Sequence, residues 1–140
     1  MIVVRGKDVQ AKDWGEMVGH GHTGVRMKWL VHKGVGDESY RHRFALREVT
    51  CEPDRKPTPM HRHEYVEAFY IISGRVIFRS EGEEVELGPG DVVYTAPNEL
   101  HGTFPVKDGG DEPLRAICCI DCVDGGENCI PWAKGINIKE

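Results

Sequence analysis

The sequence predicts a single all-β domain, a sandwich or barrel built from short strands. The chain has 140 residues, which is the size of one ordinary domain. Its 17 glycines and 8 prolines exceed average usage and suit many turns better than a helical bundle. Between residues 60 and 120, apolar runs alternate with turn sequences at the spacing of sandwich strands, and no window has the 3.6-residue period of a helix.

The expected strands follow the apolar runs in order. The first forty residues offer one strand, Val25 to Val31, after a stretch rich in glycine and histidine, and Tyr40 to Thr50 is the second. Further strands are expected at Ala68–Ile72, Val76–Phe78, Val92–Ala96 and Leu114–Ile120, separated by turns such as Gly88-Pro89-Gly90-Asp91. We expect the segment after Ile120 to leave the barrel as a tail, with Pro131 and Trp132 docking it. The barrel core then spans about residues 24–121, between an N-terminal arm (1–23) and a cysteine-containing tail (122–140).

One predicted strand is apolar on both faces. Phe69 and Ile71 share one face, while Ala68, Tyr70 and Ile72 share the other. Because a solvated outer face would be more polar, the second face is expected to be covered. A partner subunit in a homodimer would cover it, and the N-terminal forty residues are the alternative.

Charge and the N-terminal sequence exclude several classes of protein. The 18 basic and 23 acidic residues leave a net charge of −5, which argues against nucleic-acid binding. The apolar run Met1–Val4 is too short for a signal peptide or a membrane span, so we expect a cytoplasmic protein with no membrane partner. Its five cysteines are then expected to be reduced.

Four residues form a candidate metal site. On a strand, His61, His63 and Glu67 share parity and can point the same way, and returning strands could bring His101 opposite them. The alternative is that His-x-His is a polar surface face. Burying these groups on a core strand would be costly without a cation, so we favour metal binding. Three nitrogens and one oxygen suit one divalent transition metal per chain (Fe, Mn, Ni, Cu or Zn) and do not suit Ca or Mg.

These residues also carry a family resemblance. The run His61-x-His63-x3-Glu67-x6-Gly74 resembles the first motif of the cupins, and Gly90-Asp91 through His101 resembles the second. Similarity to small single-domain cupins covers Val25 to Ile120 and implies a double-stranded β-helix, a jelly-roll barrel with the metal inside one mouth. Asn98 replaces a glycine of the second motif, a mild departure because asparagine tolerates the left-handed conformation.

The resemblance implies several functions rather than one. Four protein ligands leave two open positions on an octahedral metal, which can hold a small substrate or ligand. A metal-dependent oxidoreductase of the dioxygenase type is the first hypothesis. A metal-dependent isomerase or lyase and a non-catalytic binding or sensing module are the alternatives, since the fold does not decide among them.

Candidate acid, base or anion-binding groups are Tyr65, Tyr94, His42, Arg43 and Arg47, although we favour packing or a solvated strand position for each of them. His20 and His22 are expected in a loop.

The C-terminal region adds four cysteines. Cys118 and Cys119 are expected to face opposite ways on a strand, and Cys122 and Cys129 could form a disulfide. Their spacing does not match a usual zinc or iron–sulfur pattern, although a redox role or a second metal stays open.

Overall fold

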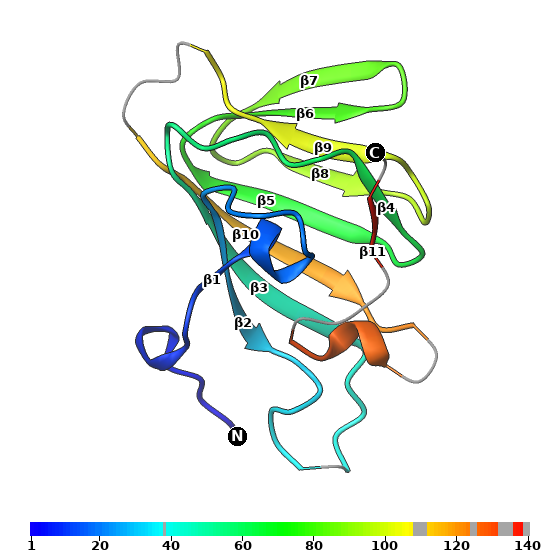
Figure 1. The fold of residues 1–140 in the computed structure, drawn as a ribbon. Coiled ribbons are helices and arrows are strands. Elements are labelled where there is room, and N and C mark those ends of the chain that lie inside the picture. The colour runs from blue at the N-terminus through cyan, green and yellow to red at the C-terminus, as the bar shows by residue number, and fades with distance from the viewer. Residues whose placement is uncertain (38, 108–111, 124–125, 132–135, 139–140) are drawn as a thin grey trace.

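The chain folds into two antiparallel sheets that face each other across one core (Figure 1). The computed structural model describes residues 1–37, 39–107, 112–123, 126–131 and 136–138. In the six-stranded sheet the order is β1 (Lys12–Asp13), β2 (Val25–Val31), β3 (Phe44–Cys51), β10 (Leu114–Asp121), β5 (Glu67–Ser73) and β8 (Val92–Thr95). In the five-stranded sheet it is β11 (Ile136–Ile138), β4 (His61–His63), β9 (His101–Phe104), β6 (Val76–Ser80) and β7 (Glu83–Leu87).

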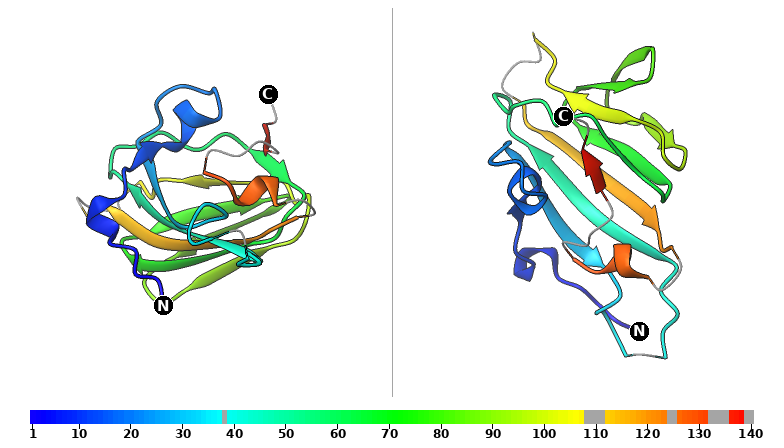
Figure 2. Two further views of the ribbon diagram at one scale, coloured as in Figure 1. Left: turned by 90° about the horizontal axis from the view of Figure 1, so that it is seen from below. Right: turned by 45° about the vertical axis from the view of Figure 1, so that its right-hand side comes forward.

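Helical segments in the described residues are short. They are a 3-10 turn at Gly6–Asp8, the four-residue helix α1 (Trp14–Met17) and a second 3-10 turn at Glu127–Cys129. In the part of the chain that the structure describes, no helix is long and apolar enough to cross a bilayer. The two sheets curve around the core as the double-stranded β-helix that the sequence predicts (Figure 2).

The predicted strands are confirmed, with differences at their ends. Val25–Val31 matches β2, and the other apolar runs lie almost wholly within strands, whereas β3 begins at Phe44 rather than Tyr40. The strand β7 has no apolar run to reveal it, because four of its five residues are exposed and only Leu87 is buried. Asn98 adopts the left-handed conformation, with φ of 63°, as expected at this turn.

Alternation along β5 separates the core from the outer surface. Phe69 and Ile71 are buried between the sheets, whereas Tyr70 and Ile72 on the other face are 47% and 38% exposed. The N-terminal segment does not cover this outer face, since β1 and β2 extend the far edge of the sheet, beyond β3. The alternative that the first forty residues cover it is therefore wrong.

The C-terminal segment returns to the barrel instead of only leaving it. After β10, Cys122 and Cys129 form a disulfide, so the expectation that all five cysteines are reduced is wrong for this pair. The short β11 then pairs with β4, opposite His61 and His63. A tail of this length can add a strand because β4 would otherwise be an edge with unpaired backbone groups. Trp132, expected to dock the tail, lies outside the described residues.

Candidate metal site

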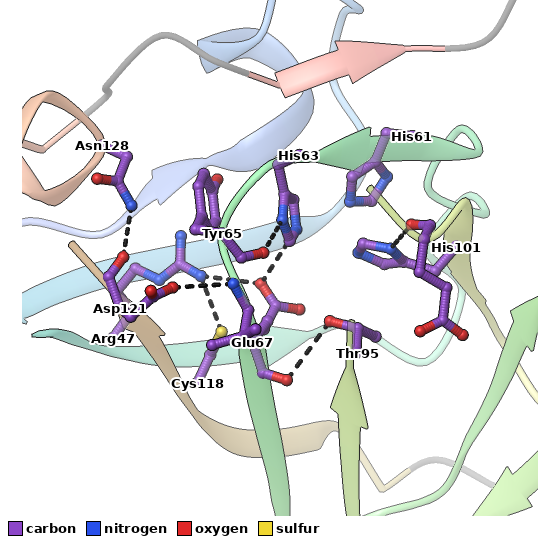
Figure 3. Close-up of polar contacts among 12 residues, drawn as sticks. Arg47, His61, His63, Tyr65, Glu67, Thr95, His101, Cys118, Asp121 and Asn128 are labelled. Atoms are coloured by element: carbon purple, nitrogen blue, oxygen red, sulfur yellow. Dashed lines mark hydrogen bonds and ion pairs between the residues drawn. The ribbon is translucent and has the colours of Figure 1, made fainter. Parts of the chain in front are cut away.

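Three histidines from two neighbouring strands converge inside the barrel. His61 and His63 occupy alternate positions of β4 and therefore share a face, and His101 on β9 is the direct register partner of His61. All three side chains are buried, and their candidate coordinating atoms lie within 4.8 Å of one another. Figure 3 shows the imidazoles turned toward a common point.

Backbone carbonyls determine which nitrogen each imidazole presents. The Nδ1 atoms of His61, His63 and His101 lie 2.8, 2.8 and 2.7 Å from the carbonyl oxygens of Pro59, Tyr65 and Glu99. Since a carbonyl only accepts hydrogen bonds, each Nδ1 carries a proton and donates it. In a neutral imidazole each Nε2 is then an unprotonated lone pair, which is the form that binds a metal.

Two of the three Nε2 atoms, those of His63 and His101, lack hydrogen-bond partners among the described residues, although they are deeply buried. Burial lowers the pKa of His61 to about 4, with His101 adding to the effect, and burial likewise lowers the pKa of His63. Three converging imidazoles, two of which have a buried Nε2 atom without a partner, fit a bound cation, because buried polar atoms otherwise find partners.

Glu67 lies beside this cluster and has a second neighbour. Its Oε2 atom is 3.8 Å from Nε2 of His63 and 3.0 Å from Nη2 of Arg47. Burial by itself raises the pKa of Glu67, but Arg47 and the nearby imidazoles lower it below the ordinary value, so the group is a carboxylate. Glu67 can therefore offer an oxygen to a metal, as the sequence predicts, while it also pairs with a cation.

Arg47 is the catalytic candidate whose side of the strand could not be predicted from the sequence. It points inward from β3 and is 3% exposed. Besides Glu67, its Nη2 atom contacts Sγ of Cys118 at 2.8 Å, and its guanidinium carbon lies 5.0 Å from the centre of the Trp29 ring. The pKa of Arg47 stays above its ordinary range, since the neighbouring acidic groups outweigh burial. The lining of the cavity thus includes a permanent positive charge.

Tyr65 is the second candidate that the fold brings to the site. Its ring stacks on His63 with centroids 4.0 Å apart, and burial raises the pKa of its hydroxyl above the ordinary value. The phenol is therefore protonated at neutral pH, and the Tyr65 side chain lines the cavity. The rest of the cavity lining is mainly apolar and includes Trp14, Val25, Met27, Val49, Phe69 and Phe78.

The remaining candidates lie elsewhere. Tyr94 projects from the outer face of β8 and is 67% exposed, and the half-buried His42 lines a hollow with Tyr40 and Phe44 in the described part of the chain. Arg43, beside His42, is exposed. His22 pairs with Asp13 and Glu16 near α1, outside the three-histidine cluster.

Cys118 and Cys119 face opposite sides of β10, as the sequence predicts. Cys118 faces the cavity, whereas its neighbour Cys119 is half-buried on the opposite face of β10. Cys51 also lines the cavity. Burial raises the pKa of the Cys51 and Cys118 thiols, to about 11 for Cys51, so both stay protonated and fill space as small apolar groups.

Sequence reasoning missed the N-terminal cover of the cavity. Trp14 lines the cavity and its ring centre lies 4.9 Å from that of His61. Asp13 holds this segment in place, accepting hydrogen bonds from the backbone of Glu16, Thr23 and Gly24. The sequence does contain a signal, because Asp13 followed three residues later by Glu16 is a typical helix-capping pattern.

Comparison with known proteins agrees with this fold. The model of the cupin domain family matches residues 47–120, a stretch that includes Arg47 and all four predicted ligands. An uncharacterized protein of Methanocaldococcus jannaschii is 31% identical over 90 residues, which are 64% of this chain and 63% of that protein. The chain thus spans less than two thirds of this relative's length.

Two further proteins match most of the chain. The oxalate-binding protein of Thermotoga maritima is 27% identical over 120 residues, which cover 85% of this chain and 93% of that protein. The structure of the polyketide cyclase RemF from Streptomyces resistomycificus superposes with a TM-score of 0.71 at 20% identity, covering 100% of this chain and 86% of that one. At that identity the likeness concerns the fold.

Proposed function

Since the chain belongs to the cupin family, we propose that it binds one divalent transition metal per chain and acts on a small organic molecule inside the barrel. His61, His63 and His101 would hold the metal through Nε2, with Glu67 beside them as the fourth donor. The observation that carries the proposal is the set of three imidazoles, whose Nδ1 atoms donate to carbonyls and whose Nε2 atoms converge. Nitrogen donors with one carboxylate suit Fe, Mn, Ni, Cu or Zn.

The reaction that we favour is a metal-dependent oxidation, of the dioxygenase type. A bound metal would supply a Lewis acid with open positions for a substrate. The protein would surround the substrate with the apolar lining and exclude water. Tyr65 would donate a hydrogen bond from its protonated hydroxyl, and Arg47 would keep a positive charge next to the site.

A binding module is the second candidate. A relative that aligns with most of this chain is named an oxalate-binding protein, and binding alone requires the same metal and cavity. The two candidates differ in turnover. A binding protein would be stabilised by its ligand without consuming it.

Elemental analysis of protein purified without an affinity tag tests the metal, and oxygen uptake with a panel of enolisable and aromatic substrates tests the reaction. We expect iron, manganese or copper near one atom per chain and uptake that depends on substrate. Uptake with none of the panel would reject the oxidase and favour the binding module. Metal content that is unchanged when the histidines are replaced would reject the site itself.

The second face of the six-stranded sheet leads us to propose a homodimer as well. Tyr70 and Ile72 on β5 and Val92 and Tyr94 on β8 form an exposed apolar strip, which we call the outer strip. β8 is the last strand of its sheet, so the strip borders an open backbone edge. A second copy of the chain placed on the outer strip would remove this apolar surface from water.

A further inference from the structure

Glu67 presents a single oxygen both to a guanidinium and to the imidazole cluster. Oε2 is the atom that pairs with Nη2 of Arg47 at 3.0 Å and also the atom that lies 3.8 Å from Nε2 of His63. Figure 3 shows the carboxylate between the guanidinium and the imidazoles. If the imidazoles hold a metal, that metal and the guanidinium of Arg47 would both be attracted to the same carboxylate oxygen.

Arg47 cannot readily withdraw from this contact. Its neighbours on β10 and in the core surround it, with Cys118 touching Nη2 and the Trp29 ring under the guanidinium. Arg47 and Cys118 are also direct register partners across β3 and β10, which fixes the start of the side chain. A buried guanidinium that loses its carboxylate would be left uncompensated, which is costly in a protein interior.

We propose that Arg47 competes with the metal for Glu67, and that it acts as a positioning residue that weakens the fourth metal ligand. The inference rests on the metal site proposed above. With Arg47 present, the three imidazoles supply most of the affinity, and Glu67 is divided between the metal and the guanidinium. Without Arg47, the same carboxylate is free to become a full ligand.

Two other roles for Arg47 lead to different results. If Glu67 binds the metal fully in the wild type, Arg47 is only a structural partner and its removal does not tighten binding. If Arg47 acts through its charge alone, its removal tightens binding whether or not residue 67 is a carboxylate. The affinity of Arg47 and Glu67 variants for zinc therefore separates the three possibilities.

The first measurement is the dissociation constant for Zn²⁺ of Arg47→Met, by competition with a chromogenic chelator at neutral pH. We expect binding about tenfold tighter than in the wild type or more, the range over which partners of metal ligands act. Arg115→Met is the matched control, since Arg115 pairs with Glu48 on the outer face of β10 at the same 3.0 Å distance. It removes one arginine and one ion pair without touching the site, and should leave the constant unchanged.

The second measurement adds Glu67→Gln to both backgrounds. We expect this change to cost about tenfold more affinity in Arg47→Met than in the wild type, because only there is Glu67 a full ligand. A gain from Arg47→Met that persists in the double variant would overturn the proposal in favour of simple charge repulsion. Equal or weaker zinc binding by folded Arg47→Met would overturn it in favour of a structural role.

Arg47→Lys keeps the test decisive if Arg47→Met does not fold. Lysine retains the charge but carries it on a flexible ammonium in place of the planar guanidinium, so its pairing with Glu67 should be weaker. We expect folded Arg47→Lys to bind zinc more tightly than the wild type but less tightly than Arg47→Met, and an unchanged constant would count against competition. Absence of zinc binding in the wild type would reject the metal site as well, and is thus distinct from failure of the competition alone.

Discussion

The two faces of the six-stranded sheet invert the usual distribution of polar and apolar groups. Its inner face contains a buried arginine and a carboxylate, Arg47 and Glu67, while its outer face exposes Tyr70, Ile72 and Tyr94. Charges are normally outside and large apolar side chains inside. The inner charges are tolerated because they pair with each other, and the outer apolar groups are what a partner subunit would cover.

A comparison of the two faces of β5 also shows that the second sheet determines which residues are buried. Alternate residues of β5 are similarly apolar, but only Phe69 and Ile71 face the strands that supply the histidines. The opposite residues have no sheet above them in the described chain. Position relative to the second sheet, and not hydrophobicity, therefore separates core residues from surface residues here.

The largest expected effect concerns the histidines of the five-stranded sheet, which lie opposite the inner face. We predict that His63→Ala lowers metal affinity by more than about 100-fold, since it removes a ligand and not merely a ligand's partner. Metal content and the dissociation constant measure the change, and circular dichroism checks that the fold is retained. His20→Ala, at an exposed position near α1, is the control and should bind metal normally. Unchanged metal content in His63→Ala would remove His63 from the site.

A matched pair of core and surface changes tests the apolar contrast directly. Ile71→Ala should lower the free energy of unfolding by about 2–5 kcal/mol, because Ile71 is 0% exposed and its loss leaves a cavity. Ile72→Ala, one residue away on the outer face, should cost less than about 1 kcal/mol in the isolated protomer. Urea denaturation at low protein concentration compares the two. Equal costs would mean that the outer face is as well packed as the core.

The N-terminal cover of the cavity should have a smaller effect. Asp13→Asn replaces an acceptor of several hydrogen bonds with a group that is partly a donor, and should cost about 1–3 kcal/mol. Although burial alone raises the pKa of the Asp13 carboxyl, hydrogen bonds from Gly24, Thr23 and Glu16 lower it below the ordinary value.

The sign of the pH dependence follows from this lowered pKa. The stabilisation by Asp13 is complete above about pH 4, the ordinary pKa of aspartate, and is lost as the pH falls through the lower folded-state value. Unfolding curves from neutral to acidic pH should therefore converge for the wild type and Asp13→Asn. A difference that stays constant in acid would show that the charge of Asp13 is not the cause.

The smallest effect on the folded protomer is expected on the outer strip. Tyr94→Lys should leave the unfolding free energy of the protomer within about 0.5 kcal/mol, since the side chain is largely exposed. It should nevertheless shift the protein from dimer to monomer, because an unpaired charge would enter the interface. Sedimentation over a range of concentrations measures this, and a wild type that is monomeric throughout would contradict the dimer.

The sequence was most informative where local spacing is enough. Strand alternation placed His61 and His63 on one face of β4, and the turn sequences located most strands. It was least informative for β7, whose glutamates resemble a loop, and for β11, which forms only because β4 offers an edge. The disulfide between Cys122 and Cys129 could be named as a possibility only, since pairing depends on where the backbone turns.

The sequence by itself predicted a β domain from its turns and strand spacing, and its resemblance to the cupins implied the barrel and the candidate ligands. Only the tertiary structure decided that Arg47 points inward to the same carboxylate oxygen, and that Trp14 covers the cavity. The reason is that alternation along a strand is local, whereas the partner of a buried charge comes from a strand far away in sequence. In this protein that distant partner determines how strongly Glu67 can bind the proposed metal.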